Sequence, residues 1–266
     1  MEILCFTIKG KLAHFRKYYA NNTALSFSIP PRTTLMGMVA AMMGWKKDSY
    51  YEKLSSDKVH FGVRVLSPLK KRFQRLNFLS IKKTGDIAKS FDSDFRGAGG
   101  RIQTPFEVVS GLNITKDEVA YQIFLASVND ENSVFDDIKD SVLKKVPVFN
   151  LSLGPANFQA SLQDIEIIKE SQITIMESNE FVHIHSAIPV SFVEELKFDK
   201  ENEDRYNFVE EDMMPGEFAA NNDREVVKMN RLLYSTTSEP LRIKVKGSYF
   251  SINTESELLN IQFMDR

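Results

Sequence analysis

The sequence predicts an α+β fold, and three observations support this. Segments with the alternating pattern of strands recur along the first 170 residues, and two segments with helical character lie between them. A long insert interrupts the series after its second strand. From Gln172 onward the chain is mostly alternating, which predicts a β-rich region. We therefore expect two parts, residues 1–170 with an insert at about 67–111, and residues 171–266.

The first strand is predicted from Ile3 to Lys9, where apolar residues alternate. After a polar loop, Pro30-Pro31 precedes a helix whose first turn Thr33 is expected to cap through its hydroxyl. The helical segment from Leu35 to Gly44 contains no polar side chain. A helix that is apolar all round must be buried, so this helix is expected to pack against the sheet.

Two more strands are predicted from Val59 to Leu66 and from Val119 to Leu125, on either side of the insert. The segment from Asp130 to Val146 has apolar residues at helical spacing and is followed by a proline, which predicts a second helix. A strand around Leu162 to Ile168 completes the series. The resulting order, strand–helix–strand–strand–helix–strand, is that of a ferredoxin-like (RRM-like) βαββαβ domain.

The bulk composition is typical of a soluble globular protein, with 42% hydrophobic and 26% charged residues among 266. The single cysteine, Cys5, favours a reducing compartment. No signal peptide is recognisable, and the longest apolar stretch, Leu35 to Trp45, is too short to span a bilayer. We therefore expect a cytoplasmic protein with no membrane contact.

Charge is distributed unevenly along the chain. Residues 1–110 contain 19 Lys and Arg against 8 Asp and Glu, a net charge of +11, whereas residues 111–266 have a net charge of −13. The basic half suits a polyanionic partner, although the two halves could simply attract each other. Because its basic residues are clustered and interleaved with aromatic ones, nucleic acid is the favoured partner.

The first candidate binding segment is the loop Ala13–Tyr19 together with the turn Pro30–Thr34. Its cations could neutralise phosphates, its rings could stack on unpaired bases, and a helix N-terminus binds anions. Composition does not distinguish this from a loop whose rings join the core and whose charges are solvated. The candidate contacts are Arg16, Lys17, Tyr18, Arg32, Thr33 and Thr34.

The second candidate is the insert, where residues 64–101 contain 10 Lys and Arg against 3 Asp. A connection of this length is usually functional, and we interpret it as a basic arm that becomes ordered on RNA. The alternative is a solvated run of charges. Its glycine-rich segment Arg96–Arg101 lacks the Gly-Lys-Ser/Thr of a phosphate-binding P-loop. The candidate contacts are Lys70, Lys71, Arg72, Arg75, Lys82, Lys83, Arg96 and Arg101.

Signals for catalysis and for metal binding are weak. No His, Cys and Asp residues cluster at metal-ligand spacing, no nucleophile elbow is present, and no cofactor is expected. Metal-free RNA cleavage would need a base and an acid, and the only plausible set is His14 with Tyr18 or Tyr19. A lone histidine beside basic residues is more often a phosphate contact. A third segment, the Gly-Pro turn Leu151–Phe158, is by itself only a turn signal.

Two N-terminal segments resemble a known family. Gly10–Arg16 and Phe27–Gly37, with the run Pro-Pro-Arg-Thr-Thr-Leu-x-Gly, are similar to the start of the fifth CRISPR-associated protein family. Members of this family are the type I Cascade subunit that caps the crRNA 5′ handle. The turn Ser152–Phe158 also resembles a later turn of the family. The remainder of the chain matches in its order of elements.

The resemblance implies a ferredoxin-like body with a basic β-hairpin thumb before the third strand. It also implies binding of the crRNA 5′ handle, contact with the Cascade backbone subunit and the large PAM-reading subunit, and, through the complex, RNA-guided recognition of target DNA in prokaryotic antiviral defence. The length and the acidic tail look most like type I-B members. By position, the handle contacts would be Arg16, Lys17, Arg32, Thr33 and Thr34.

Three functional hypotheses follow. The first is a non-catalytic handle-binding subunit. The second is a metal-independent endoribonuclease that processes CRISPR precursor RNA through His14 and a tyrosine. One branch of the family cleaves RNA with a Tyr and an adjacent Lys-His pair, and the absence of any Lys-His dipeptide here favours the first hypothesis. The third is an adaptor whose stretch 194–225, with 12 acidic and 4 basic residues, binds a basic partner; a solvated loop is the alternative.

Overall fold

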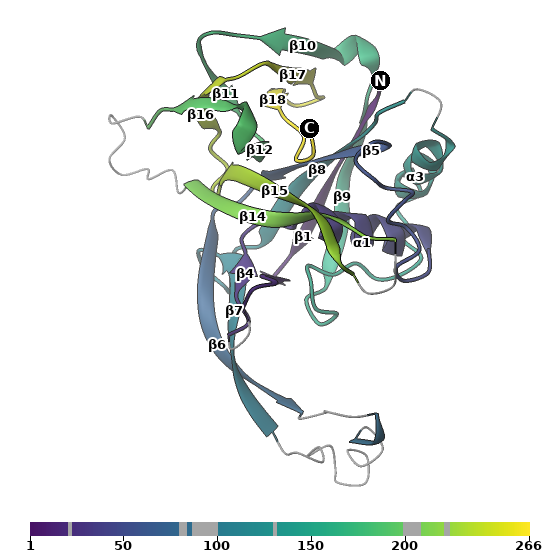
Figure 1. The fold of residues 1–266 in the computed structure, drawn as a ribbon, viewed down its shortest axis with the longest axis vertical. Coiled ribbons are helices and arrows are strands. Elements are labelled where there is room, and N and C mark those ends of the chain that lie inside the picture. Colours follow the sequence, from purple (N-terminus) through teal and green to yellow (C-terminus); the bar gives the residue numbers. More distant parts are fainter. Residues whose placement is uncertain (21–22, 80–83, 87–100, 130–131, 199–208, 221–223) are drawn as a thin grey trace.

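The computed structural model describes residues 1–20, 23–79, 84–86, 101–129, 132–198, 209–220 and 224–266. At its centre is a four-stranded antiparallel sheet in the order β5-β8-β1-β9 (Figure 1). Its strands are β1 (Ile3–Gly10), β5 (Val59–Val65), β8 (Val119–Ser127) and β9 (Ala160–Ile168). Helix α1 (Arg32–Met43) connects β1 to β5, and helix α3 (Ser133–Leu143) connects β8 to β9. The α+β prediction and the predicted order of elements are confirmed.

Both faces of the central sheet are covered. On one face, Leu4, Phe6 and Ile8 of β1 join the buried cluster that contains the apolar side chains of α1 and α3. Because side chains alternate along a strand, Ile3 and Cys5 point to the other face, where they pack with the C-terminal strands β17 (Ser248–Asn253) and β18 (Leu258–Ile261). This two-sided burial explains why β1 is apolar at successive positions.

Helix α1 begins at Arg32, one residue before the predicted cap. Pro31 occupies the N-cap position without a side-chain bond, and its carbonyl accepts from the N–H groups of Thr34 and Leu35 at 2.9 and 3.1 Å. The prediction that Thr33 caps the helix is therefore wrong, because the helix begins earlier and Thr33 already lies within its first turn. At the other end, Gly44 adopts a left-handed conformation (φ 69°), as helix C-caps favour.

The insert forms a long antiparallel hairpin that extends away from the body (Figure 1). Its strands are β6 (Leu69–Leu79) and β7 (Arg101–Gly111), and their pairing runs without interruption. At its base, β7 also pairs with β2 (Leu12–Ala13), next to the short pair of β3 (Phe15–Arg16) and β4 (Ser26–Phe27). The expected inserted hairpin is confirmed over the described residues.

The C-terminal region is β-rich, as predicted, and its described residues form three three-stranded sheets. The first contains β10 (Ile173–Glu177), β17 (Ser248–Asn253) and β18 (Leu258–Ile261). The second contains β11 (Phe181–Ile184), β16 (Leu241–Val245) and β13 (Val193–Leu196). The third contains β12 (Ile188–Pro189), β15 (Val226–Ser235) and β14 (Val209–Phe218). Short 3-10 helices span Glu170–Gln172 and Val190–Phe192.

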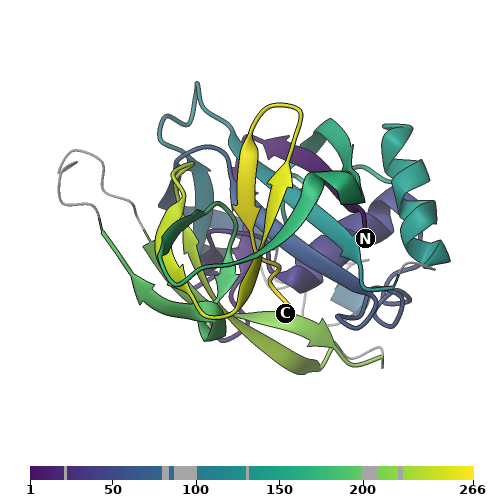
Figure 2. The ribbon, with the colours of Figure 1, turned by 90° about the horizontal axis from the view of Figure 1, so that it is seen from above.

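The view from above shows the β17–β18 hairpin, in yellow, lying over the central sheet (Figure 2). Where it is described, much of the acidic stretch 194–225 lies in strands β13 and β14; residues 199–208 and 221–223 lie outside the described part. None of the helices in the described ranges has the length and apolar character needed to cross a membrane.

Candidate functional site

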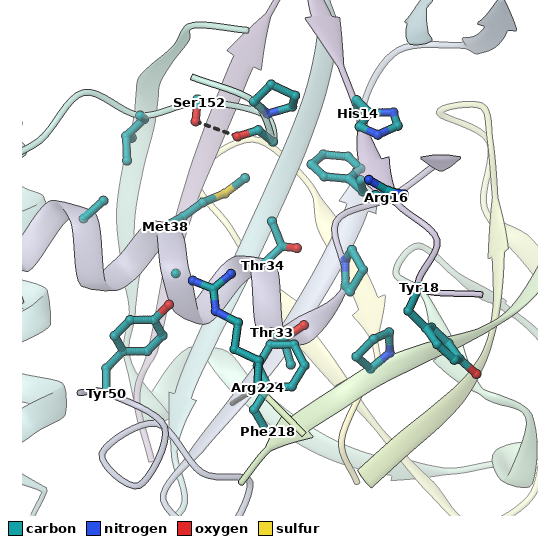
Figure 3. Close-up of a pocket in the computed structure, with 18 of the residues that line it drawn as sticks. His14, Arg16, Tyr18, Thr33, Thr34, Met38, Tyr50, Ser152, Phe218 and Arg224 are labelled. Atoms are coloured by element: carbon teal, nitrogen blue, oxygen red, sulfur yellow. Dashed lines mark hydrogen bonds between the residues drawn. The ribbon is translucent and has the colours of Figure 1, made fainter. Parts of the chain in front are cut away.

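A cavity of about 790 Å³ lies where the first loop, the start of α1, the hairpin and the tip of β14–β15 meet. Figure 3 shows Arg16 and Arg224 approaching it from different sides, with Thr34 of α1 between them. The lining combines cations, hydroxyls and aromatic rings. Its main polar and aromatic members are Arg16, Tyr18, Thr33, Thr34, Tyr50, Phe78, Phe106, Ser152, Phe218 and Arg224.

The Gly-Pro turn forms one wall of this cavity. The backbone N–H of His14 donates to the carbonyl of Leu153 at 2.9 Å, which ties the turn to the first loop. Gly154 has a φ of 105°, and a Cβ built on it would lie 1.9 Å from the carbonyl oxygen of His14. Only glycine can occupy this position without displacing the backbone. The tertiary structure thus joins two candidate segments that the sequence separates by more than a hundred residues.

Arg16 and the two tyrosines that follow are accessible, as an RNA contact requires. Arg16 is exposed at the end of β3, and one of its guanidinium nitrogens donates to the carbonyl of Ala20 at 3.4 Å. Tyr18 and Tyr19 are about half exposed, and their rings contact each other edge to face. Cations beside free aromatic faces are suited to phosphates and unpaired bases.

Arg32 is not among the residues that line this cavity, and its side chain is fully buried. Its Nε donates to Asp265 at 2.5 Å, and Nη2 donates to the carbonyls of Leu54 and Val59 at 2.6 and 2.9 Å. The guanidinium also lies over the ring of Phe61. The prediction that Arg32 contacts RNA is therefore wrong: a residue near the C-terminus neutralises its charge inside the protein.

Thr33 and Thr34 both line the cavity, but to different degrees. Thr33 is buried and Thr34 is half-buried. Both lie in the first turn of α1, where backbone N–H groups that lack a helical partner favour anions. Thr34 is the more accessible of the two.

Lys17 and Lys71 are already paired with carboxylates of β14. The Nζ atom of Lys17 donates to Asp212 at 2.5 Å, and that of Lys71 donates to Glu210 at 3.0 Å. The hydroxyl of Tyr234 lies within hydrogen-bond distance of both carboxylates, 3.0 Å from Glu210 and 2.8 Å from Asp212, and can donate its proton to either one. These two lysines therefore support the alternative in which the basic and acidic halves of the chain attract each other. Neither ammonium group is free to bind a phosphate without giving up its carboxylate partner.

The ionisation of this network follows from its geometry. Burial opposes the charge on Lys17, yet the hydrogen bond and the charge of Asp212 raise its pKa above the ordinary 10.5. Burial likewise opposes ionisation of Glu210, but the hydroxyl of Ser28 and the ammonium of Lys71 lower its pKa below the ordinary 4.5. Both groups are therefore charged at neutral pH.

The basic residues of the hairpin face in different directions. Lys71, Phe73 and Arg75 share one side of β6, whereas Phe78, on the other side, lines the cavity beside Phe106. Lys70 and Arg75 are exposed. Arg72 is half-buried, and it donates to the hydroxyl of Ser110 at 3.0 Å and to the carbonyl of Leu112 at 2.7 Å. The remaining candidates, Lys82, Lys83 and Arg96, lie outside the described residues, as does the side chain of Arg101.

The histidine considered for catalysis is buried and engaged. His14 is 5% exposed, and its Nδ1 donates to the carbonyl of Glu107 at 2.7 Å, which leaves only Nε2 for proton transfer. Its ring packs against that of Phe106 in a tilted arrangement, with the ring centroids 3.9 Å apart. Burial lowers the pKa of His14 below 6.5, so the imidazole is neutral at pH 7. His14 and Tyr18 line the cavity, whereas Tyr19 is not among its lining residues.

Arg224 is a charged lining residue that the sequence did not indicate. It follows β14 near the tip of the β14–β15 hairpin, within the acidic stretch, and its side chain is half exposed. Its Nε donates to Asp48 at 2.9 Å, and Asp48 also accepts from the hydroxyl of Tyr51. No local pattern around Arg224 distinguishes it from a solvated charge. In the described ranges, no group of three or more His, Cys, Asp or Glu residues is arranged to hold a metal ion.

Two solved structures of CRISPR proteins are similar to this chain. The crystal structure of a CRISPR protein from Archaeoglobus fulgidus is similar to this chain with a TM-score of 0.54 and 13% identity, over 98% of both chains. The match to a chain of a CRISPR RNA-guided surveillance complex covers 90% of each of the two chains, with a TM-score of 0.44 and 13% identity. No curated protein matches the sequence.

The first of these structures, at 13% identity, is evidence for a shared fold. A family model gives the assignment, because it matches residues 3–229 and so covers most of the chain. Its description is CRISPR-associated protein (Cas_Cas5), which confirms the family resemblance carried by the N-terminal segments. The chain therefore belongs to the CRISPR-associated Cas_Cas5 family.

Proposed function

We propose that this chain is a non-catalytic subunit of a type I CRISPR Cascade complex and holds the 5′ handle of the crRNA. The carrying observation is the cavity, where Arg16 and Arg224 come together with Thr34 and with exposed aromatic rings. Guanidinium groups pair with phosphates in a planar, bidentate geometry. Aromatic lining gives unpaired bases a surface on which to stack.

The family and the architecture support this proposal. Family membership links the chain to CRISPR systems. We also class the central sheet and its two helices as ferredoxin-like, because the order β5-β8-β1-β9 places the first and third strands of the unit side by side in the centre. As partners we propose the Cascade backbone subunit, the large PAM-reading subunit and, through the complex, target DNA. The proposed subtype is I-B and the proposed location is the prokaryotic cytoplasm.

The test is binding of the organism's own CRISPR repeat RNA, labelled, at several salt concentrations. Arg16→Ala and Arg224→Ala should each weaken binding about tenfold and reduce the salt slope by about one, because each removes a phosphate contact. Arg231→Ala is the matched control, since Arg231 is exposed and pairs with Glu211 on the β14–β15 hairpin. Binding that neither cavity variant changes would contradict the proposal.

A nuclease assay tests the absence of catalysis. His14 is buried with Nδ1 engaged, and the chain has no Lys-His dipeptide. Incubation of the purified protein with repeat RNA in EDTA should therefore yield no product. A product that disappears in the variant His14→Ala would instead support the metal-independent endoribonuclease.

A further inference from the structure

An exposed apolar patch lies at the end of α3 and in the segment that follows it. We define the α3 patch by four large side chains within seven residues, each about half exposed or more. They are Leu143 (46% exposed), Val146 (74%), Val148 (62%) and Phe149 (55%). Single exposed apolar residues are common on protein surfaces, but a cluster of this kind marks an interaction site. Helix α3 lies at the outer edge of the molecule in both ribbon views (Figure 1 and Figure 2).

The backbone beneath the patch is held in place. The N–H groups of Val148 and Phe149 donate to the carbonyls of Met42 and Ala41, both at 3.1 Å, at the C-terminal end of α1. Val148 also packs on Gly44, where an added Cβ would lie 2.8 Å from its Cγ1. The apolar side chains are therefore presented on a fixed backbone, which reduces the entropy lost when a partner binds.

Lysines surround the patch. Lys144 and Lys145 lie within it, and Lys46 and Lys47 follow α1 beside the segment to which the patch is bonded; all four are exposed. Lys47 lies 3.8 Å from Asp48, whereas the other three have no ion pair among the described residues. Exposed Asp140 lies one turn before Lys144 on α3 and Asp48 faces Lys47, so lysines outnumber carboxylates around the patch. The net positive rim favours a partner with carboxylates around an apolar centre.

We propose that the α3 patch is a docking site for a protein subunit that presents aliphatic side chains flanked by carboxylates. Three of the four apolar side chains are aliphatic and offer bases no ring to stack on, so the patch suits protein better than RNA. Asn150, the residue after the patch, lines the cavity. A subunit docked here would therefore lie next to the proposed RNA site. The inference rests on the proposed place of the chain in a multisubunit complex.

The test is co-expression of the full chain with each of the other proteins encoded in its CRISPR locus, followed by affinity measurement for any that co-purify. The double variant Val146→Ser, Phe149→Ser should lower the affinity by at least about tenfold, as central interface residues do. Lys46→Glu with Lys144→Glu should lower it as well. Val148 and Lys145 are left unchanged because Val148 packs on Gly44 and Lys145 has a left-handed backbone (φ 56°).

The matched control is the double variant Ile175→Ser, Leu258→Ser. It removes two similarly exposed apolar side chains (63% and 65%) from the β10-β17-β18 sheet, away from the α3 patch. The control variant should bind the partner protein with unchanged affinity. All variants should bind repeat RNA as the unmodified chain does, which separates this inference from the RNA proposal. Four outcomes overturn it: no locus protein binds the unmodified chain; the patch variants bind as well as the control; they lose RNA binding instead; or they only abolish self-association, which would make a second copy the occupant.

Discussion

The guanidinium of Arg32 lies in the interior, paired with Asp265 and bonded to backbone carbonyls. Burying a charge costs free energy unless the charge is paired and its N–H groups are satisfied. His60 Nδ1 lies 3.1 Å from the same carboxylate, so Asp265 joins α1 to β5. Because Arg32 follows two prolines at the start of α1, a local pattern favoured an anion site, but its partner is 233 residues further along the chain.

The first prediction concerns this ion pair. Arg32→Ala should lower the free energy of unfolding by about 3–5 kcal/mol, because it leaves the carboxylate of Asp265 buried without its cation. Denaturant titration followed by circular dichroism measures the loss. Exposed Arg16→Ala is the control, and its stability should be unchanged. A stable Arg32→Ala protein with impaired RNA binding would show that Arg32 contacts RNA after all.

At the scale of elements, strand alternation decides what the basic hairpin can do. Lys71 and Arg75 lie on the same side of β6, yet only Lys71 reaches a carboxylate of β14. Arg75 lies further from the body and is exposed. The acidic strand β14 therefore neutralises the base of the hairpin and leaves its outer part positive. Within the described part of the chain, some carboxylates of the acidic stretch are therefore paired inside the protein. Those carboxylates are not free to bind a basic partner, as the adaptor hypothesis requires.

The second prediction separates these two roles. Arg75→Ala should weaken repeat-RNA binding and reduce the salt slope by about one, with little change in stability. Lys71→Ala should act mainly on stability, because it leaves Glu210 without its cation. Salt-dependent binding and thermal unfolding of both variants provide the measurement. Equal effects of the two changes on RNA binding would contradict this division.

The third prediction concerns pH. The pKa of Glu210 is lower in the folded protein than its ordinary 4.5, so the folded state binds fewer protons than the unfolded state. Its contribution to stability is therefore complete above pH 4.5 and is lost as the pH falls through the lowered value. Glu210→Gln should destabilise the protein by about 1–3 kcal/mol at pH 7, and this difference should shrink in acid.

Urea titrations of both proteins between pH 7 and pH 3 measure this difference. Glu211→Gln is the matched control, because Glu211 is the next residue of β14 but pairs with Arg231 at the surface. Its effect at pH 7 should be smaller. A Glu210→Gln difference that stays constant down to pH 3 would show that the carboxylate is not stabilised in its ionised form.

At the scale of the whole molecule, the two parts expected from the sequence share their cores. Met214, Leu232 and Tyr234 of the C-terminal region belong to the same buried cluster as α1 and β1. On the other face of the sheet, Ile252 and Phe263 pack with β1 and β8. A boundary near residue 170 therefore divides the sequence but not the core. Each of the two hydrophobic clusters that cover the central sheet contains residues from both sides of that boundary.

The fourth prediction follows from these shared cores. A fragment of residues 1–170 should fail to unfold cooperatively, because one face of its sheet and part of the other lose their apolar cover. Near-ultraviolet circular dichroism and a urea titration, compared with the full chain, test this. A fragment with a sharp transition and native-like aromatic signals would support two independent domains.

The sequence by itself determined the elements, the family and one part of the site. Strand alternation, helical spacing and the proline and glycine positions are local signals, and they identified the central strands and both helices. The hairpin form of the insert was expected only from the family resemblance, because its own residues indicated no more than a basic arm. Arg16, Tyr18 and Thr34, predicted as RNA contacts, line the cavity and are at least partly accessible, which leaves that prediction open to test.

Only the tertiary structure decided which charges are free. Arg32, Lys17 and Lys71 look equivalent to Arg16 in the sequence, yet Asp265, Asp212 and Glu210 neutralise them from the far end of the chain. Arg224 is also paired with a carboxylate, that of Asp48, but it is half exposed and lines the cavity because its hairpin packs on α1. Electrostatic pairing depends on distance in space, so a sequence pattern shows where charges are but not which carboxylate lies opposite each one.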